Sequence, residues 1–271
     1  MNEDSDDPVL RELFRNVKFR QALSYAIDRD TIVQSVFNGI GQAGWVPFTP
    51  RSPFWDEKET YKKYEYNIEK AKSMLDELGL KDINGDGFRD MADGKPIEFT
   101  LVTNAGVSAR EGMATLVVED WKRIGLKVNF KAMDFNTIVT NINGRKFEAF
   151  LISYGITGVE PNFTASTWKK AGTFHFWRKP DAELFDWEKR VDELFDLGIS
   201  TYNFDEAKKY YVEFQQIVSE QLPLIFVAGQ RQLYAQKKGL ANYVVKDAKG
   251  FLGETDHGVR WWKDEARRKT Q

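Results

Sequence analysis

The sequence has no cysteine and only two histidines, and both shortages exclude whole classes of functional site. Without cysteine there are no disulfides, thiolate zinc sites, iron–sulfur clusters or cysteine nucleophiles. With His175 and His257 alone, a metal site built from two or three imidazoles is nearly excluded. No apolar run approaches the roughly 18–20 residues that a membrane-spanning helix needs. The 39 basic residues are outnumbered by 41 acidic ones, so the basic excess typical of non-specific nucleic-acid binding is also missing.

The composition that remains is typical of a folded globular protein. Of the 271 residues, 42% are hydrophobic and 14% are aromatic, and eight are tryptophan. A chain of this length buries about 75% of the surface that its unfolded form exposes, which gives a substantial core. The acidic start, Asn2 to Asp7, has neither the basic residues nor the apolar stretch of a secretory signal. Taken literally, this indicates a cytoplasmic protein; the alternative is a fragment of an exported chain.

The middle of the chain alternates between strand patterns and helix patterns. Apolar and polar residues alternate over 97–101 and 126–130, and 147–154 is a nearly continuous apolar run. A helical pattern lies between the first two segments, with Ser108 and Glu111 spaced to form a capping box. The resulting order, β-α-β-α-β, predicts an α/β fold whose sheet is largely parallel and flanked by helices.

Further patterns extend this α/β unit in both directions. Residues 40–63 contain three prolines and are expected to be extended, and 224–228 are predicted to form a buried strand. Asp30 and Asn67 are the expected N-caps of two of the helices. Besides the helix that begins near Ser108, the expected helices are 17–28, 31–37, 68–78, 134–142, 181–197 and 205–220.

One loop has the spacing of a calcium site. Residues 82–93 place oxygen-bearing side chains at positions 1, 3, 5, 9 and 12, a glycine at position 6 and a backbone carbonyl at position 7. Position 12 is aspartate instead of glutamate and a strand follows, so the loop is not a full EF-hand. The alternative is a polar turn whose side chains bind their own backbone. The predicted ligands of a structural calcium ion are Asp82, Asn84, Asp86, Phe88 (through its carbonyl), Asp90 and Asp93.

Motifs for nucleotide binding and for hydrolysis are weak. Gly39 to Gly44 fit G-x-G-x-x-G, but a helix pattern precedes them and a proline-rich stretch follows, which is not the context of a dinucleotide site. The sequence contains neither a G-x-S-x-G nor an H-E-x-x-H motif. A hydrolase of the glycosidase type, using paired carboxylates that include Glu160, stays an alternative. No cofactor is expected to be required.

The segment after the apolar run 147–154 is the best candidate for a ligand site. It leaves the strand through two glycines, and ligands commonly bind at the carboxyl ends of the strands of an α/β sheet. Its polar side chains offer hydrogen bonds, and two nearby tryptophans offer flat faces that suit sugars or peptides; alternatively, both tryptophans belong to the core. The candidate ligand-binding residues are Tyr154, Gly155, Thr157, Glu160, Asn162, Trp168 and Trp177.

Several segments together resemble a known family. The run from Leu13 to Asp30 is similar to the R-x-A-L-x-x-A-I-D/N-R helix of the family 5 extracellular solute-binding proteins, the oligopeptide- and dipeptide-type receptors of ABC importers. The resemblance continues in the same order through 71–79, 82–90, 154–161 and 215–223. It implies a periplasmic-binding-protein-like type II fold, and a protein that binds its ligand without changing it chemically.

In that family the A-I-D-R helix opens the carboxy-terminal lobe, and a full-length member has another lobe before it. The resemblance therefore implies that residues 1–223 form the C-terminal ligand-binding lobe. Residues 224–271 would be a return segment that belongs to the absent N-terminal lobe. The two lobes would close on a ligand and deliver it to a membrane permease. Such a receptor is periplasmic or extracellular, and its full-length form is compatible with a membrane anchor.

Thr157 affects which ligand the resemblance implies. Peptide-binding members carry an aspartate three residues before the Glu-Pro pair, where it holds the amino terminus of the peptide, and this chain has Thr157 there. The amine-binding role therefore does not carry over, and relatives that lack the carboxylate include oligosaccharide receptors. An oligosaccharide is expected slightly ahead of a peptide. A third alternative is an interaction protein that uses the aromatic residues of 40–63 as a partner surface.

Overall fold

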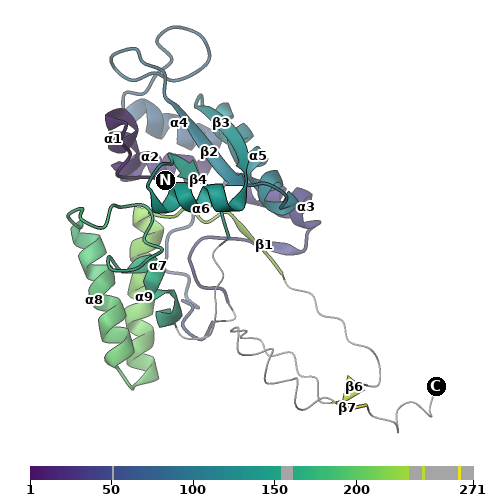
Figure 1. Cartoon of the computed structure of the whole chain (residues 1–271), viewed down its shortest axis with the longest axis vertical. Helices are drawn as coiled ribbons and strands as arrows, with labels where there is room; N and C mark the ends of the chain where they lie inside the picture. Colours follow the sequence, from purple (N-terminus) through teal and green to yellow (C-terminus); the bar gives the residue numbers. More distant parts are fainter. Residues whose placement is uncertain (51, 154–160, 232–239, 242–261, 264–271) are drawn as a thin grey trace.

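A three-stranded parallel sheet forms the centre of the fold (Figure 1). The computed structural model describes residues 1–50, 52–153, 161–231, 240–241 and 262–263. The central strand β2 (Glu98–Asn104) pairs in parallel with β3 (Lys127–Met133) on one side and β4 (Ala149–Phe150) on the other. Helices α5 (Ser108–Arg123) and α6 (Phe135–Asn143) make the two crossovers. The predicted α/β fold with a parallel sheet and flanking helices is confirmed.

The strand patterns are only partly realised. In β2 the predicted alternation is confirmed, because Phe99, Leu101 and Thr103 are buried while the residues between them are partly exposed. The strand predicted over 147–154 is shorter than expected and pairs only over β4. Its apolar residues have another partner, because Phe147 packs with Ile138, Ile142 and Phe176 in a separate small cluster.

Four helices precede the sheet, and side-chain caps fix where they begin. Asn67 caps the fourth helix as predicted, accepting a hydrogen bond from the Lys70 amide at 2.8 Å. The prediction that Asp30 caps the third helix is wrong, because Asp28 accepts the Thr31 amide at 2.9 Å and Asp30 lies in the first turn. These helices are α1 (Pro8–Arg15), α2 (Val17–Ala26), α3 (Arg29–Phe37) and α4 (Ile68–Glu77).

The capping box predicted at the start of α5 does not form. The N-cap position is Val107, whose side chain makes no capping bond, and Ser108 is already helical. Glu111 instead accepts a hydrogen bond from the Gly106 amide at 2.7 Å. The Glu111 carboxylate therefore accepts from the residue before the N-cap, whereas in a capping box it would accept from the N-cap residue itself.

A second core lies beside the sheet. Helices α8 (Asp186–Ser200) and α9 (Phe204–Gln221) form a hairpin that packs with η1 (Pro161–Thr164) and α7 (Ala165–Trp168) (Figure 1). The two hairpin helices approach closely at Gly198, where an added Cβ would lie 2.3 Å from the Tyr211 hydroxyl. Only glycine fits there without displacing the buried ring.

Residues 224–228 run between the two cores and are not the sheet strand that was predicted. Leu224 and Phe226 pack against the second core, whereas Ile225 and Val227 pack against the core around the sheet. This two-sided packing explains the continuous apolar pattern. The strand itself, β5 (Ala228–Gln230), begins later and pairs antiparallel with β1 (Gly41–Ala43).

The described part of the predicted return segment thus contacts the predicted lobe. Residues 224–230 pack on both cores or pair with β1. Beyond them, the structure describes Arg231 and the antiparallel pair of β6 (Leu240–Ala241) and β7 (Trp262–Lys263). No helix in the described part of the chain is long and apolar enough to cross a membrane.

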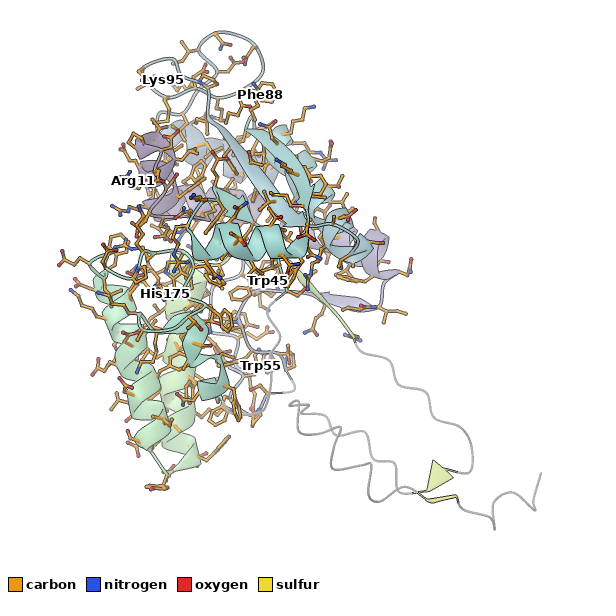
Figure 2. All side chains as sticks on the ribbon, viewed as in Figure 1. Arg11, Trp45, Trp55, Phe88, Lys95 and His175 are labelled. Atoms are coloured by element: carbon orange, nitrogen blue, oxygen red, sulfur yellow. The ribbon has the colours of Figure 1, made fainter. Side chains whose placement is uncertain are left out.

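The aromatic residues of 40–63 face inward, which contradicts the partner-surface alternative. Phe48 and Phe54 are buried in the second core, and Trp55 packs against it. Trp45 packs against the core around the sheet (Figure 2). The segment is not extended as predicted, because it runs through successive turns: the Ser52 amide donates to the Thr49 carbonyl at 2.8 Å, and the Trp55 amide to the Ser52 carbonyl at 3.0 Å. Its rings cover the two cores.

The first part of the acidic start, residues 2–5, is buried. Asn2 donates from its side chain to the Phe147 carbonyl at 2.9 Å, and Glu3 lies fully buried with its carboxylate 3.4 Å from the Arg20 guanidinium. Burial raises the pKa of Glu3 from 4.5 to about 7, against the opposing effect of Arg20. The folded protein therefore binds this proton more tightly than the unfolded chain does.

The raised pKa of Glu3 predicts a specific pH dependence of stability. Its contribution to the free energy of unfolding is fully present below pH 4.5, falls as the pH rises, and is lost above about pH 7. In the wild type we expect Glu3 to lower the free energy of unfolding by on the order of 3 kcal/mol between pH 5 and pH 8. In Glu3→Gln we expect this part of the decrease to be absent. Urea unfolding at a series of pH values measures it. The control is Asp6→Asn, an exposed acid of the same segment; parallel curves for wild type and Glu3→Gln would contradict the prediction.

Candidate functional site

The carboxyl ends of the three parallel strands meet at one edge of the sheet, which we call the carboxyl edge. It comprises Asn104 at the end of β2, Met133 at the end of β3 and Leu151 just after β4. Backbone bonds hold these ends in register: the Ala105 amide donates to the Met133 carbonyl at 2.7 Å, and the Leu151 amide to the Val102 carbonyl at 2.9 Å. Ligands of α/β proteins bind at such an edge.

A positively charged side chain is fixed at the carboxyl edge. Arg110, in the first turn of α5, donates from Nη1 to the Asn104 side-chain oxygen and from Nε to the Ser153 hydroxyl at 3.2 Å. No carboxylate pairs with this guanidinium among the described residues. A guanidinium held by neutral partners keeps its charge and further donors for a carboxylate, a phosphate or hydroxyl groups.

Apolar side chains flank Arg110 on the same edge. Val107 precedes α5 and Phe135 opens α6, so both directly follow the ends of parallel strands. Both side chains are exposed, as is that of Val139 one turn further along α6. The carboxyl edge therefore combines a fixed cation with apolar surface, which suits a ligand with both kinds of group.

The sequence analysis missed Asn104, Arg110 and Phe135. A usable signal existed, because Asn104 and Phe135 come within five residues of the ends of the predicted strands 97–101 and 126–130, and Arg110 lies in the first turn of the helix between them. The glycines after the third strand drew attention to that strand end alone, although the ends of the first two are equivalent.

Four of the candidate ligand-binding residues lie outside the described residues, and their roles stay predictions. They are Tyr154, Gly155, Thr157 and Glu160. Described residues on both sides of 154–160 are held by hydrogen bonds: Ser153 accepts from Arg110, and Asn162 donates from its side chain to the Tyr211 hydroxyl. The structure thus joins the upstream end to the carboxyl edge and the downstream end to the second core.

The predicted stacking role of Trp168 and Trp177 needs correction. Their side chains are only 4% and 1% exposed, and both belong to the second core. The ring of Trp168 lies edge-on to Phe214 with centroids 5.0 Å apart, and Trp177 donates its indole N–H to Glu188 at 2.9 Å. Because the protein itself covers both rings, the core alternative describes them.

The oxygens of the predicted calcium loop bind the loop's own backbone. Asp82 accepts the Gly85 and Gly87 amides at 2.7 and 2.9 Å, and Asn84 accepts the Asp86 amide at 2.8 Å. Both glycines have positive φ, 81° and 90°, as the tight turn requires. The loop lies at the end of the molecule away from α8 and α9, where Phe88 and Lys95 are labelled in Figure 2.

The side chains of the other three predicted calcium ligands also have partners in the protein. Asp86 accepts the Phe88 amide at 2.8 Å, buried Asp90 accepts the Ile83 amide at 2.9 Å, and Asp93 pairs with Lys95. Within the part of the chain that the structure describes, no group of three or more histidine, aspartate or glutamate side chains could hold a metal ion. The polar-turn alternative accounts for the motif, and calcium binding finds no support.

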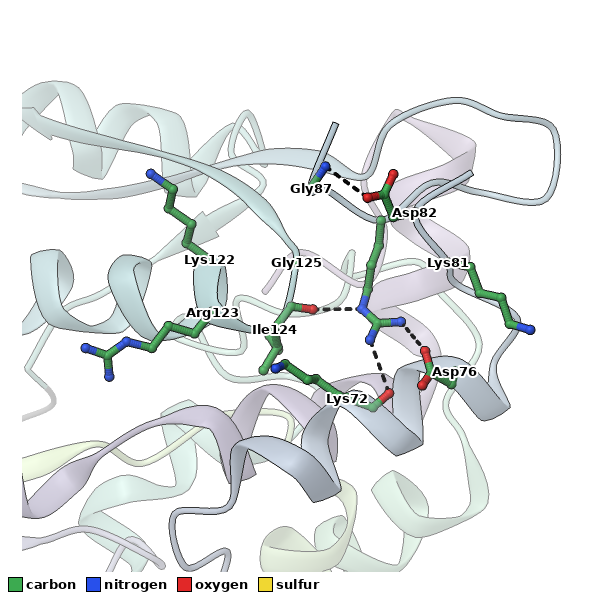
Figure 3. Close-up of a pocket in the computed structure, with 10 residues that line it drawn as sticks. Lys72, Asp76, Lys81, Asp82, Gly87, Lys122, Arg123, Ile124 and Gly125 are labelled. Atoms are coloured by element: carbon green, nitrogen blue, oxygen red, sulfur yellow. Dashed lines mark hydrogen bonds and ion pairs between the residues drawn. The ribbon is translucent and has the colours of Figure 1, made fainter. Parts of the chain in front are cut away.

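A hollow of about 420 Å³ lies beside this loop (Figure 3). Lys72, Lys122 and Arg123 contribute to its lining, and Arg89 spans it, donating to the carbonyl of Ile124 at 2.7 Å and to Asp76 at 2.6 Å. Gly125 lies just before β3 begins, so the hollow is at the amino ends of the strands. It is therefore at the opposite edge of the sheet from Arg110.

The bonding of the loop predicts its response to calcium. We expect the unfolding temperature to be the same in excess calcium and in excess chelator, because the loop oxygens already accept backbone amides. Asp82→Ala should lower the free energy of unfolding by about 1 kcal/mol in both buffers, since two amides lose their acceptor. Differential scanning calorimetry measures both. A calcium-dependent rise in the wild type that Asp82→Ala abolishes would contradict this.

Comparison with known proteins shows which family the chain resembles. A family model, described as bacterial extracellular solute-binding proteins, family 5 Middle, matches residues 1–175. The oligopeptide-binding protein AppA of Bacillus subtilis is 33% identical over 236 residues, which are 86% of this chain and 42% of that protein. This chain thus spans about half the length of the relatives it matches.

Solved structures agree with this assignment. AppA from Bacillus subtilis in complex with a nonapeptide has a TM-score of 0.73 at 28% identity, covering 97% of this chain and 49% of that one. The periplasmic binding protein MelB from Agrobacterium fabrum C58, in complex with stachyose, has the same TM-score at 26% identity and covers 82% and 34%. The fold is that of the periplasmic binding proteins, and the chain belongs to the bacterial extracellular solute-binding proteins of family 5.

Proposed function

We propose that this chain is the carboxy-terminal, ligand-binding lobe of a substrate-binding protein that serves an ABC importer outside the cytoplasm. It would capture an oligopeptide or an oligosaccharide between itself and an amino-terminal lobe and deliver it to the permease. The observation that carries the proposal is the Arg110 guanidinium, held by Asn104 and Ser153 at the carboxyl edge. The match to about half of each relative supports the assignment to one lobe.

Binding without chemistry fits the groups at this edge better than hydrolysis does. The carboxylates of Asp134 and Glu111 lie there, and both are occupied in holding backbone: Asp134 accepts the Asn136 amide at 3.0 Å, and Glu111 accepts that of Gly106. A glycosidase needs two carboxyl groups that face each other across the substrate. These two described carboxylates hold backbone and do not provide this arrangement, and Glu160, the acid named for the hydrolase alternative, lies outside the described residues.

Arg110 also bears on the class of ligand. A guanidinium forms its strongest hydrogen bonds with carboxylates, and the apolar side chains of Val107 and Phe135 suit side chains of a peptide. AppA was solved with a nonapeptide and MelB with stachyose, so both ligand classes occur among similar proteins. Because no described carboxylate pairs with Arg110, we favour an oligopeptide with a free carboxylate over a neutral oligosaccharide, the reverse of the preference drawn from Thr157.

The proposed function predicts how affinity is divided between lobes. We expect the isolated chain to bind peptides and oligosaccharides weakly or not at all, because one lobe supplies only part of the contacts. The full-length, two-lobed receptor should bind one of the two classes tightly. Isothermal titration of both proteins with a mixed peptide library and with oligosaccharides measures this. Tight binding by the isolated chain, or binding of neither class by the full-length receptor, would contradict the proposal.

Arg110 predicts a matched pair of variants in the full-length receptor. Arg110→Gln should weaken binding of a peptide with a free carboxylate by about 10–100-fold, because a charge-assisted hydrogen bond is lost, and should change binding of its amidated form much less. Arg123→Gln, the same substitution at the far end of α5, is the control. Equal affinities for the two variants would show that Arg110 does not contact the ligand.

A further inference from the structure

Arg29, the last residue of the A-I-D-R motif, is a buried cation whose described partners are carbonyls and one hydroxyl. Its side chain is 4% exposed, and no carboxylate pairs with it among the described residues. Burial lowers the pKa of Arg29 to about 9, so the guanidinium is still charged at neutral pH. A buried charge without a counter-ion is costly unless its hydrogen bonds are satisfied, so the role of Arg29 lies in those bonds.

The partners of Arg29 come from four separate segments. Nη1 donates to the Ser24 carbonyl at 2.9 Å and to that of Tyr64 at 3.3 Å. On the other side of the guanidinium, Nε lies between the carbonyls of Gly44 at 3.2 Å and Phe226 at 3.0 Å. The Arg29 side chain therefore bonds the end of α2 to Gly44, just after β1, and to Phe226, just before β5.

The β1–β5 pair, with its flanking residues 44 and 231, is a two-stranded ribbon that depends on its base. The Gly44 amide donates to Val227 at 3.0 Å, and the Arg231 amide donates to Ile40 at 3.2 Å. At the base the strands are so close that a Cβ on Gly44 would lie 3.2 Å from that of Phe226. A two-stranded ribbon is marginally stable by itself, so whether it stays formed depends on the bonds at its base together with its packing on α3.

We propose that Arg29 is a positioning residue that fixes the base of this ribbon, and with it the direction of β5 in the return segment. This rests on the proposed two-lobed function, in which the chain passes from this lobe to the other beyond β5. Arg29 would then affect ligand capture without touching the ligand, because lobe closure needs a fixed line about which the lobes turn. Trp45, whose ring centroid lies 4.4 Å from the guanidinium carbon, covers the site from one side.

Amide hydrogen exchange on the 271-residue chain tests the local part of the proposal. Lysine keeps the charge, but its single ammonium cannot reach carbonyls on two sides. In Arg29→Lys we expect the Gly44 and Arg231 amides to exchange at least about tenfold faster relative to the Ala105 and Leu151 amides of the sheet. The control is Arg20→Lys, a buried arginine bonded to the Gln221 carbonyl and not to the ribbon, which should change both sets of amides alike.

The outcomes separate this proposal from the proposed function. Ribbon and sheet amides that change in parallel in Arg29→Lys would overturn it. If Arg29→Lys does not fold, Ser24→Ala is the second variant, because it removes only the hydroxyl that accepts from Nη2 of Arg29. It should speed amide exchange in the ribbon by a smaller factor, and no increase would overturn the proposal. In the full-length receptor, Arg29→Lys should weaken ligand binding about tenfold, and unchanged affinity would overturn the link to lobe closure. Absence of ligand binding by the unmodified receptor would instead contradict the proposed function.

Discussion

Buried carbonyl groups at helix ends and in irregular backbone need donors, and in this protein three buried arginines supply many of them. Arg20 bonds the carbonyls of Phe14 and Gln221, and Arg89 bonds those of Leu80 and Ile124. Arg29 does the same for four segments at once. Each guanidinium has five donors in a fixed plane, so one side chain can join stretches that no helix or sheet connects. The long loops of this fold can pack inward because these donors are present.

The two cores of the protein have different roles. The sheet positions the carboxyl edge, where Arg110 is held by Asn104 at the end of β2 and by Ser153 after β4. The α8–α9 hairpin and the segment 161–168 form a separate apolar unit, and residues 224–228 join the two by packing on both. A ligand at the carboxyl edge would therefore lie beside the place where the two units meet.

Local patterns in the sequence predicted the α/β class and most helices, because burial in this protein follows simple periodicity. Some failures are local, since the N-caps lie at Asp28 and Val107 instead of Asp30 and Ser108. Two others share one cause: the side chains had partners that are distant in sequence. Residues 224–228 look like a strand because both of their faces are covered, and Trp168 looks available because the pattern cannot show Phe214 beside it. For the site, the edge of the sheet was predictable from strand order. Arg110 was not singled out, since its importance comes from Ser153, 43 residues away.

The anchoring of Ser153 and Asn162 has a consequence for how such receptors diversify. One of these residues is tied to the first turn of α5 and the other to the buried hydroxyl of Tyr211, and both tethers belong to well-packed helices. A variant that keeps Arg110 and Tyr211 therefore keeps both of these described residues in place. New cargo preferences are compatible with exchange of exposed side chains at the carboxyl edge, such as those of Val107 and Phe135, because such exchanges leave both bonds intact.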